Sequence, residues 1–199
     1  MKKPLYSLIL CLMTAIPFIG VKASFFSESA NFELPKKVKA YNLIQNKTFE
    51  WDLKESVAHK NLKGTVISFL SSKCPCSNSH LTHLMNLKKK FPQFLFFGIH
   101  SNKKQKEKDV RSFFLKKGLS FPLLLDSSLE LANSFRAIKT PHTFVINKKG
   151  KLLFHGGITN SVSFKFATKF YLEEALTKIN NKEPLEKVYA RAIGCSIAR

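Results

Sequence analysis

The sequence predicts an α/β fold: a mixed central sheet with helices on both faces, extended by an N-terminal hairpin. Apolar runs at residues 65–70 and 94–99 flank a segment with leucines at helical spacing, which predicts parallel strands joined by a right-handed crossover. Residues 143–155 contain two apolar runs around Lys148-Lys149-Gly150, a pattern typical of a β-hairpin. Parallel and antiparallel pairs in one sheet make the predicted sheet mixed.

The remaining elements follow from local patterns. The N-terminal hairpin is expected from two short strand-like runs that surround Gln45-Asn46-Lys47. A short extended segment is expected at 121–126, and Gly118 ends the helix before it. The hairpin strands are expected at 38–42 and 48–53, and helical segments at 55–61, 77–90, 107–117, 129–135 and 164–179. Four residues of the last helix are candidates for burial: Phe166, Phe170, Leu172 and Leu176.

The first 23 residues have the composition of a secretory signal peptide. Lys2 and Lys3 precede an apolar run at 5–20, and small residues follow as a cleavage site. The apolar run is short for a membrane span, so cleavage and export to a periplasmic or other extracytoplasmic space are preferred over a retained anchor. The expected organisation is a signal peptide at 1–23, a linker at 24–37, a folded domain at 38–180 and a C-terminal tail at 181–199.

The number of cysteines indicates redox chemistry rather than a set of structural disulfide bonds. Loss of the signal peptide removes Cys11 and leaves Cys74, Cys76 and Cys195. Three cysteines in an oxidising compartment are too few for a disulfide framework, and one of them must be free or exchanging.

The chain is strongly basic, with a formal net charge of +20. Removal of residues 1–23 takes away three lysines and no acidic residue, which leaves +17. Because the lysines are spread along the chain, and because export separates the protein from most nucleic acid, no nucleic-acid partner is expected. A solvated basic surface is the preferred interpretation, and weak association with an anionic membrane surface or an acidic partner is the alternative.

Cys74 lies where a buried strand is expected to pass into a helix. Pro75 suits the first helical position, which makes Cys74 the N-cap residue. Free backbone N–H groups and the positive end of the helix dipole favour the thiolate there, and Lys73 adds a positive charge. We therefore interpret Cys74 as a reactive thiol.

Several segments resemble the thioredoxin superfamily: Cys74-Pro75 after a strand, Thr140-Pro141-His142 before a strand, and Asn147-Lys148-Lys149-Gly150 in the hairpin. More narrowly, residues 38–179 are similar to exported redoxin proteins of the alkyl hydroperoxide reductase/thiol-specific antioxidant family. The sequence Gly194-Cys195-Ser196-Ile197 resembles the tail of some redoxin-like proteins. The resemblance implies a thioredoxin-like fold and an enzyme that acts as a thiol oxidoreductase or a thiol-dependent antioxidant protein.

The resemblance also implies roles for individual residues. Pro141 would be a cis-proline whose loop lies against Cys74 and shapes the substrate-docking surface. Ser71 would stand for the threonine that donates a hydrogen bond near the thiolate in peroxiredoxins. Two departures weigh against peroxide reduction: Ile67 replaces the family's proline, and no arginine is found just before the strand at 143–147.

The sequence leaves open which thiol resolves the intermediate. Cys76 follows Cys74 at Cys-x-Cys spacing, and on a regular helix their side chains would diverge by about 200°. A disulfide between them would then be strained. Cys195 on the tail is the other candidate, either as a redox partner, as one half of a permanent bond that pins the tail, or as a free thiol.

Three functions remain open at this point. Thiol–disulfide exchange is preferred, peroxide reduction is the close alternative, and a non-catalytic module that binds copper or a partner protein is the third. His80 and His83 follow Cys76 at helical spacing, but packing or surface roles are preferred for them, so neither a cofactor nor a metal ligand is expected. The expected partners are protein or small-molecule thiols and disulfides, or peroxides, and a reducing partner protein.

Overall fold

The structure is a computed structural model that describes residues 37–52 and 61–199, all within one structural unit. The predicted signal peptide, nearly all of the linker and most of the helical turn expected at 55–61 lie outside these residues.

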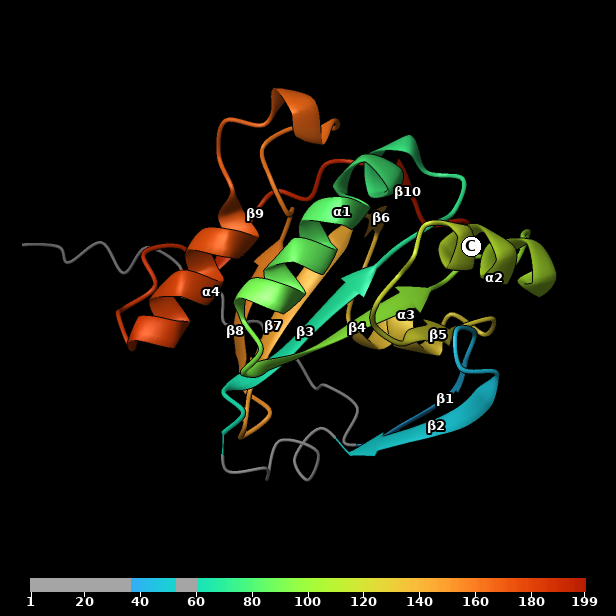
Figure 1. Cartoon of the computed structure of the whole chain (residues 1–199), viewed down its shortest axis with the longest axis horizontal. Coiled ribbons are helices and arrows are strands. Elements are labelled where there is room, and N and C mark those ends of the chain that lie inside the picture. The colour runs from blue at the N-terminus through green and yellow to red at the C-terminus, as the bar shows by residue number, and fades with distance from the viewer. Residues whose placement is uncertain (1–36, 53–60) are drawn as a thin grey trace, which may run out of the picture. The chain divides into compact units, whose positions relative to one another are not determined.

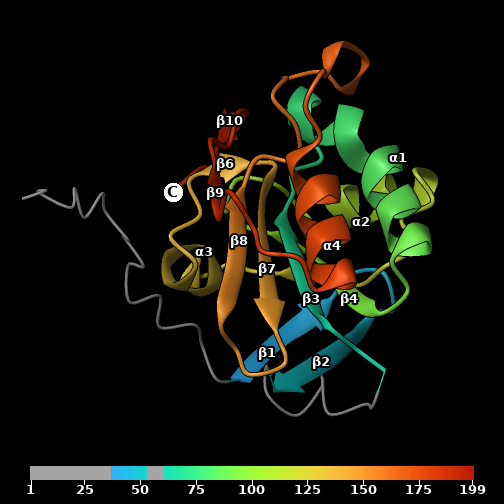
Figure 2. The ribbon, with the colours of Figure 1, turned by 90° about the vertical axis from the view of Figure 1, so that its left-hand side faces the viewer.

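Among the described residues, eight strands form one mixed sheet in the order β2-β1-β5-β4-β3-β7-β8-β9 (Figures 1 and 2). The central strand β3 pairs in parallel with β4, as the sequence predicted, and its other edge pairs antiparallel with β7. The N-terminal hairpin of β1 and β2 extends the sheet at one edge. The strands are β1 Lys37–Asn42, β2 Lys47–Asp52, β3 Gly64–Phe69, β4 Phe94–His100, β5 Leu123–Leu125, β7 His142–Asn147, β8 Leu152–Gly156 and β9 Tyr189–Ala190.

Helices cover both faces of this sheet, which confirms the predicted fold class. The α-helices are α1 Pro75–Lys90, α2 Glu107–Lys116, α3 Glu130–Ser134 and α4 Tyr171–Asn181. Figure 2 shows α1 and α4 side by side on one face and α3 on the other. Side chains of α1, α2 and α4 share one core cluster, and Ala132 of α3 lies in the second. All six residues of β3 are buried, because both faces of this central strand are covered.

The last helix begins later than predicted. It starts at Tyr171, and only a short 3₁₀ turn, η1 (Phe164–Phe166), forms in the preceding segment. The Asn160 side-chain oxygen accepts hydrogen bonds from the backbone N–H groups of Thr168 and Lys169, both at 3.0 Å, which holds this segment as a loop. The expected burial of Phe166 and Phe170 was therefore wrong, since they are 71% and 37% exposed, whereas Leu172 and Leu176 are buried as predicted.

The segment expected as a tail is built into the fold. Strand β9 pairs with β8, and β10 (Cys195–Ser196) pairs with β6 (Lys139–Thr140) in a separate two-stranded sheet. Beyond β10, the Ile197 side chain is buried, and the Arg199 guanidinium donates a hydrogen bond to the Ala137 carbonyl at 3.0 Å. The C-terminal strand β10 lies at the same end of the sheet as the start of α1 (Figure 1). None of the helices in the described part of the chain combines the length and the apolar character needed to cross a membrane.

Candidate active site

Cys74 occupies the N-cap of α1, as the sequence predicted. Its backbone is extended, with φ −89° and ψ 112°, and Pro75 is the first residue of the helix. The Ser77 backbone N–H donates a hydrogen bond to the Cys74 sulfur at 3.4 Å, so one free donor at the helix start is directed at that sulfur. The Cys74 N–H in turn donates to the Ser71 carbonyl at 3.2 Å, which closes the turn between β3 and α1.

The loop that contains Pro141 lies directly against this sulfur. The Thr140–Pro141 peptide bond is cis, as the resemblance implied. Since β3 ends at Phe69 and pairs with His142 at the start of β7, the loop before β7 meets the turn after β3. When protonated, the Cys74 thiol donates to the Thr140 carbonyl, with the sulfur and oxygen 2.9 Å apart. Cys74 is only 2% exposed in this arrangement.

The C-terminal strand brings Cys195 to the same place. In the β6–β10 pair, Cys195 is opposite Thr140, whose carbonyl group contacts the Cys74 sulfur, so the C-terminal segment pairs with the strand next to that sulfur. Gly194 is required for this approach, because a Cβ atom at that position would overlap the Thr140 carbonyl group and come within 3.3 Å of the Pro141 Cδ. A side chain at position 194 would therefore prevent β10 from approaching β6 as it does.

The three sulfur atoms of Cys74, Cys76 and Cys195 all lie within 4.8 Å of one another, and each is a free thiol. The expected divergence of Cys74 and Cys76 was thus wrong. That expectation assumed regular helix geometry for both residues, whereas Cys74 is an extended N-cap residue outside the helix. Its side chain is consequently free to point toward that of Cys76.

The environment of the cluster favours one negative charge, on Cys74. Burial is the largest influence on the pKa of the Cys74 thiol and raises it, but hydrogen bonds from the side chains of Cys195 and Thr140 and from the backbone N–H groups of Ser77 and Cys195 together outweigh burial and lower that pKa to about 7. Burial and then the hydrogen bond and charge of Cys74 raise the pKa of Cys195 to about 12. Burial and the Cys74 charge raise the pKa of Cys76 in the same way.

Ser71 supports the turn through contacts other than the expected one. Its hydroxyl oxygen accepts a hydrogen bond from the Gln105 side-chain amide at 3.0 Å, and its backbone N–H donates to the Ser77 hydroxyl at 3.3 Å. The side-chain amide oxygen of Gln105, Oε1, also accepts a hydrogen bond from the Ser72 hydroxyl. Sequence reasoning missed Gln105, because a glutamine in a lysine-rich loop gives no sign of contact with a turn 33 or 34 residues earlier.

The histidines near the cluster are engaged in hydrogen bonds or in ring packing. His80 Nδ1–H donates to the Cys76 carbonyl at 2.8 Å, and its Nε2 lies 2.8 Å from the Thr159 hydroxyl. The His83 ring packs on Phe164, with ring centroids 4.6 Å apart. Burial and then the neighbouring His155 lower the pKa of His142 to about 4, so His142 is neutral at physiological pH.

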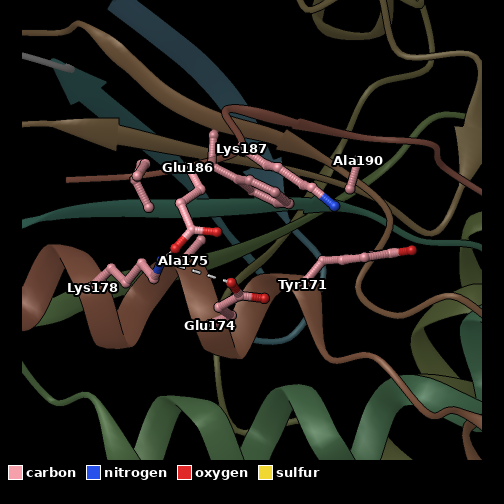
Figure 3. A pocket seen from close by; sticks show the side chains of 9 residues that line it. Tyr171, Glu174, Ala175, Lys178, Glu186, Lys187 and Ala190 are labelled. Atoms are coloured by element: carbon pink, nitrogen blue, oxygen red, sulfur yellow. Dashed lines mark hydrogen bonds and ion pairs between the residues drawn. The ribbon is translucent and has the colours of Figure 1, made fainter. Parts of the chain in front are cut away.

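A pocket elsewhere on the molecule is lined by α4 and the segment before β9 (Figure 3). The Lys178 ammonium lies at its edge, 2.6 Å from a Glu186 carboxylate oxygen and 3.9 Å from one of Glu174. Its lining contains neither cysteine nor histidine, so it offers no nucleophile comparable to Cys74.

Solved structures share this fold. An uncharacterized conserved protein from Geobacillus kaustophilus matches with a TM-score of 0.71 at 22% identity, covering 82% of this chain and 88% of that chain. StoA from Bacillus subtilis matches with a TM-score of 0.52 at 21% identity, covering 71% and 97%. These likenesses establish a thioredoxin-like fold.

Two curated proteins are similar in sequence. The thiol-disulfide oxidoreductase ResA of Halalkalibacterium halodurans is 27% identical over 116 residues, which cover 56% of this chain and 66% of ResA. The sporulation thiol-disulfide oxidoreductase A of Bacillus subtilis is 30% identical over 110 residues, which cover 49% of this chain and 60% of that protein. The chain thus spans slightly less than two thirds of the length of these relatives. The AhpC/TSA family model matches residues 29–155, well over half of the sequence, and the chain belongs to the AhpC/TSA family.

Proposed function

We propose that the protein is an exported thiol–disulfide oxidoreductase in which Cys74 is the attacking nucleophile and Cys195 resolves the mixed disulfide. The observation that carries this proposal is the position of Cys195, held opposite Thr140 by β10 with its sulfur within 4.8 Å of the Cys74 sulfur. The names of the two curated relatives, both thiol-disulfide oxidoreductases, support the reaction class.

The reaction proceeds by two exchanges. The Cys74 thiolate attacks one sulfur of a substrate disulfide, forms a mixed disulfide and releases the other half as a thiolate. The Cys195 thiol then attacks the Cys74 sulfur, and its proton passes to the substrate sulfur that leaves Cys74. A Cys74–Cys195 disulfide forms, and the second half of the substrate leaves as a thiol. Two protein thiols are oxidised as one substrate disulfide is reduced, and the reverse sequence oxidises a substrate dithiol.

Cys195 is the better resolving thiol on geometric grounds. A Cys74–Cys76 disulfide would close a ring across Pro75, whose φ is fixed near the helical value, and this leaves little freedom to reach disulfide geometry. Cys195 approaches from a separate strand with free rotation about its side-chain bonds. Cys76 is then the third thiol of the cluster, available if the tail has moved away.

The tail also controls access to the nucleophile. Cys74 is 2% exposed, and β10 occupies the edge of β6 beside Pro141. A substrate in an extended conformation would pair with the same backbone edge, so β10 must separate from β6 before a protein disulfide reaches the sulfur. In this account Pro141 shapes the docking surface, and Ser71 holds the turn that positions Cys74.

Trapping with a small aromatic disulfide tests the proposal. The reduced Cys195→Ser variant should retain a mixed disulfide at Cys74, whereas the wild type should release it as the internal disulfide forms. Cys74→Ser should form no adduct at Cys76 or Cys195 at neutral pH on the same timescale. Adduct formation by Cys74→Ser at the wild-type rate would refute the assignment of the nucleophile.

Peroxide is the alternative oxidant, in keeping with the family, and would convert the Cys74 thiolate to a sulfenic acid that Cys195 condenses with. Stopped-flow measurement of peroxide consumption separates the two reactions. We expect a rate no greater than that of free cysteine, and a much faster rate would make the protein a peroxidase. Export is supported by residues 1–23, and N-terminal sequencing of the extracytoplasmic protein should find Ser24 as its first residue.

A further inference from the structure

We propose that Cys74, Cys76 and Cys195 also bind one Cu(I) ion through their three sulfur atoms. This site uses the reduced form of the cluster and does not depend on disulfide exchange, since binding oxidises none of the thiols. The three ligands come from three positions: the N-cap of α1, its first turn, and β10.

The spacing of the sulfurs suits a three-coordinate ion. Sulfurs about 2.3 Å from a central metal in a trigonal plane lie about 4.0 Å from one another. The sulfurs of the cluster already lie within 4.8 Å of one another. Changes of less than about 1 Å, within reach of rotation about cysteine side-chain bonds, would therefore complete the site.

The kind of ligand selects the metal. Thiolates are soft ligands that favour Cu(I), whereas carboxylates and carbonyls favour harder cations. In the part of the chain that the structure describes, the cluster contains three thiols and no histidine or carboxylate as a fourth member. Structural zinc sites are almost always four-coordinate, so Zn²⁺ would have to add a solvent ligand here. A three-sulfur set without a fourth protein ligand fits Cu(I) better.

The surroundings allow the ion to enter. Cys74 is buried, but Cys76 and Cys195 are partly exposed, so one side of the cluster faces solvent. A metal ion arriving from that side can bind the two exposed sulfurs first and Cys74 last. Coordination then joins β10 to the start of α1, so the bound ion should stabilise the pairing of the tail with β6.

Competition with a coloured Cu(I) chelator under anaerobic conditions tests the site. Reduced, metal-free wild type should withdraw one Cu(I) per chain from bathocuproine disulfonate. Cys74→Ser, Cys76→Ser and Cys195→Ser should each weaken Cu(I) binding by at least about tenfold, because each removes one of three ligands. Cys11→Ser in the full chain is the matched control, and it should leave both affinity and stoichiometry unchanged.

X-ray absorption of the wild-type complex gives a readout that does not depend on variants. Three sulfur neighbours at about 2.3 Å would support the proposal. Two sulfurs, a nitrogen neighbour, or equal affinity of the wild type and the Cys195→Ser variant would overturn it. Preference for Zn²⁺ in a parallel titration with a zinc-sensitive dye would also overturn it, since the argument rests on the absence of a fourth protein ligand.

Discussion

Two regions of the candidate active site, the start of α1 and strand β10, differ in the exposure and in the pKa of the thiols that they carry. Cys74, at the start of α1, is buried to 2% exposure, and its position is fixed by the turn after the central strand β3. Cys195 is partly exposed on a two-residue strand that pairs with the two-residue strand β6. The buried thiol has the lower pKa, about 7, and the more exposed one has a pKa raised to about 12.

This contrast shows that the exposure of a thiol in this site does not by itself determine its pKa. Burial alone would have raised the pKa of Cys74, but donors directed at its sulfur outweigh that cost. Cys195 supplies one of those donors while it keeps its own proton, so the C-terminal segment both covers Cys74 and helps to ionise it. The reduced site therefore combines an activated sulfur with restricted access.

The largest effect that we expect is a separation of the two thiols in a pH titration. At pH 7 about half of Cys74 should be thiolate, against about 3% for a free cysteine of ordinary pKa, whereas Cys195 should be almost wholly protonated. ¹³C NMR of cysteine Cβ atoms measures this in the reduced, metal-free protein without requiring access to the sulfur. As the pH rises, the Cys74 signal should shift with a midpoint near 7.

The Cys195 signal in the same titration should not reach its midpoint below pH 10. The Cys195→Ser variant keeps a hydroxyl near Cys74 but lacks the sulfur of Cys195. Its pH titration is compared with that of the wild type. A Cys74 midpoint above 8.5 in the wild type would contradict the proposed division of charge between the two thiols.

A second, smaller effect should follow from Gly194→Ala. The added Cβ atom cannot coexist with the Thr140 carbonyl group, so β10 should separate from β6. We expect alkylation of Cys74 to become at least about tenfold faster as the cover is lost, and closure of the Cys74–Cys195 disulfide to become slower by a similar factor. Mass spectrometry of quenched samples measures both rates.

Ser196→Ala is the matched control for Gly194→Ala, because Ser196 lies on the same strand and its exposed hydroxyl accepts a hydrogen bond from the Lys139 ammonium at 3.1 Å. This control should leave both rates within about twofold of the wild type. Equal rates in Gly194→Ala and the wild type would mean that the tail does not cover the nucleophile.

The smallest effect is expected from Ile197→Ala. Ile197 is 6% exposed, and its backbone N–H donates to the Ile138 carbonyl at 3.1 Å, a contact that the substitution retains. Loss of the buried side chain should weaken the packing of the C-terminal segment and increase hydrogen exchange of the Cys195 and Ile197 amides severalfold, with little change at β3. Unchanged exchange at these amides would show that the side chain does not anchor the tail.

Local sequence patterns predicted the parts of the site that short segments determine. The strand, the turn with Cys74 and the helix opened by Pro75 follow from neighbouring residues, and the structure confirms them. The cis bond before Pro141 followed from a resemblance. These features require no knowledge of distant contacts.

Features that depend on distant partners were missed or predicted wrongly. Strand β10 has only two residues and forms because the edge of β6 is available, so the tail sequence alone does not predict it. The late start of α4 depends on the hydrogen bonds of Asn160 to a loop that has apolar residues at helical spacing. The closeness of Cys76 to Cys74 depends on the extended backbone of the N-cap residue.

The central claim is that Cys74 and Cys195 form the functional thiol pair. Peptide mapping after oxidation of the reduced protein by one equivalent of a small disulfide tests it most directly. The account predicts one Cys74–Cys195 linkage with Cys76 recovered as a free thiol. A Cys74–Cys76 linkage, or Cys195 recovered as a free thiol after full oxidation, would contradict it.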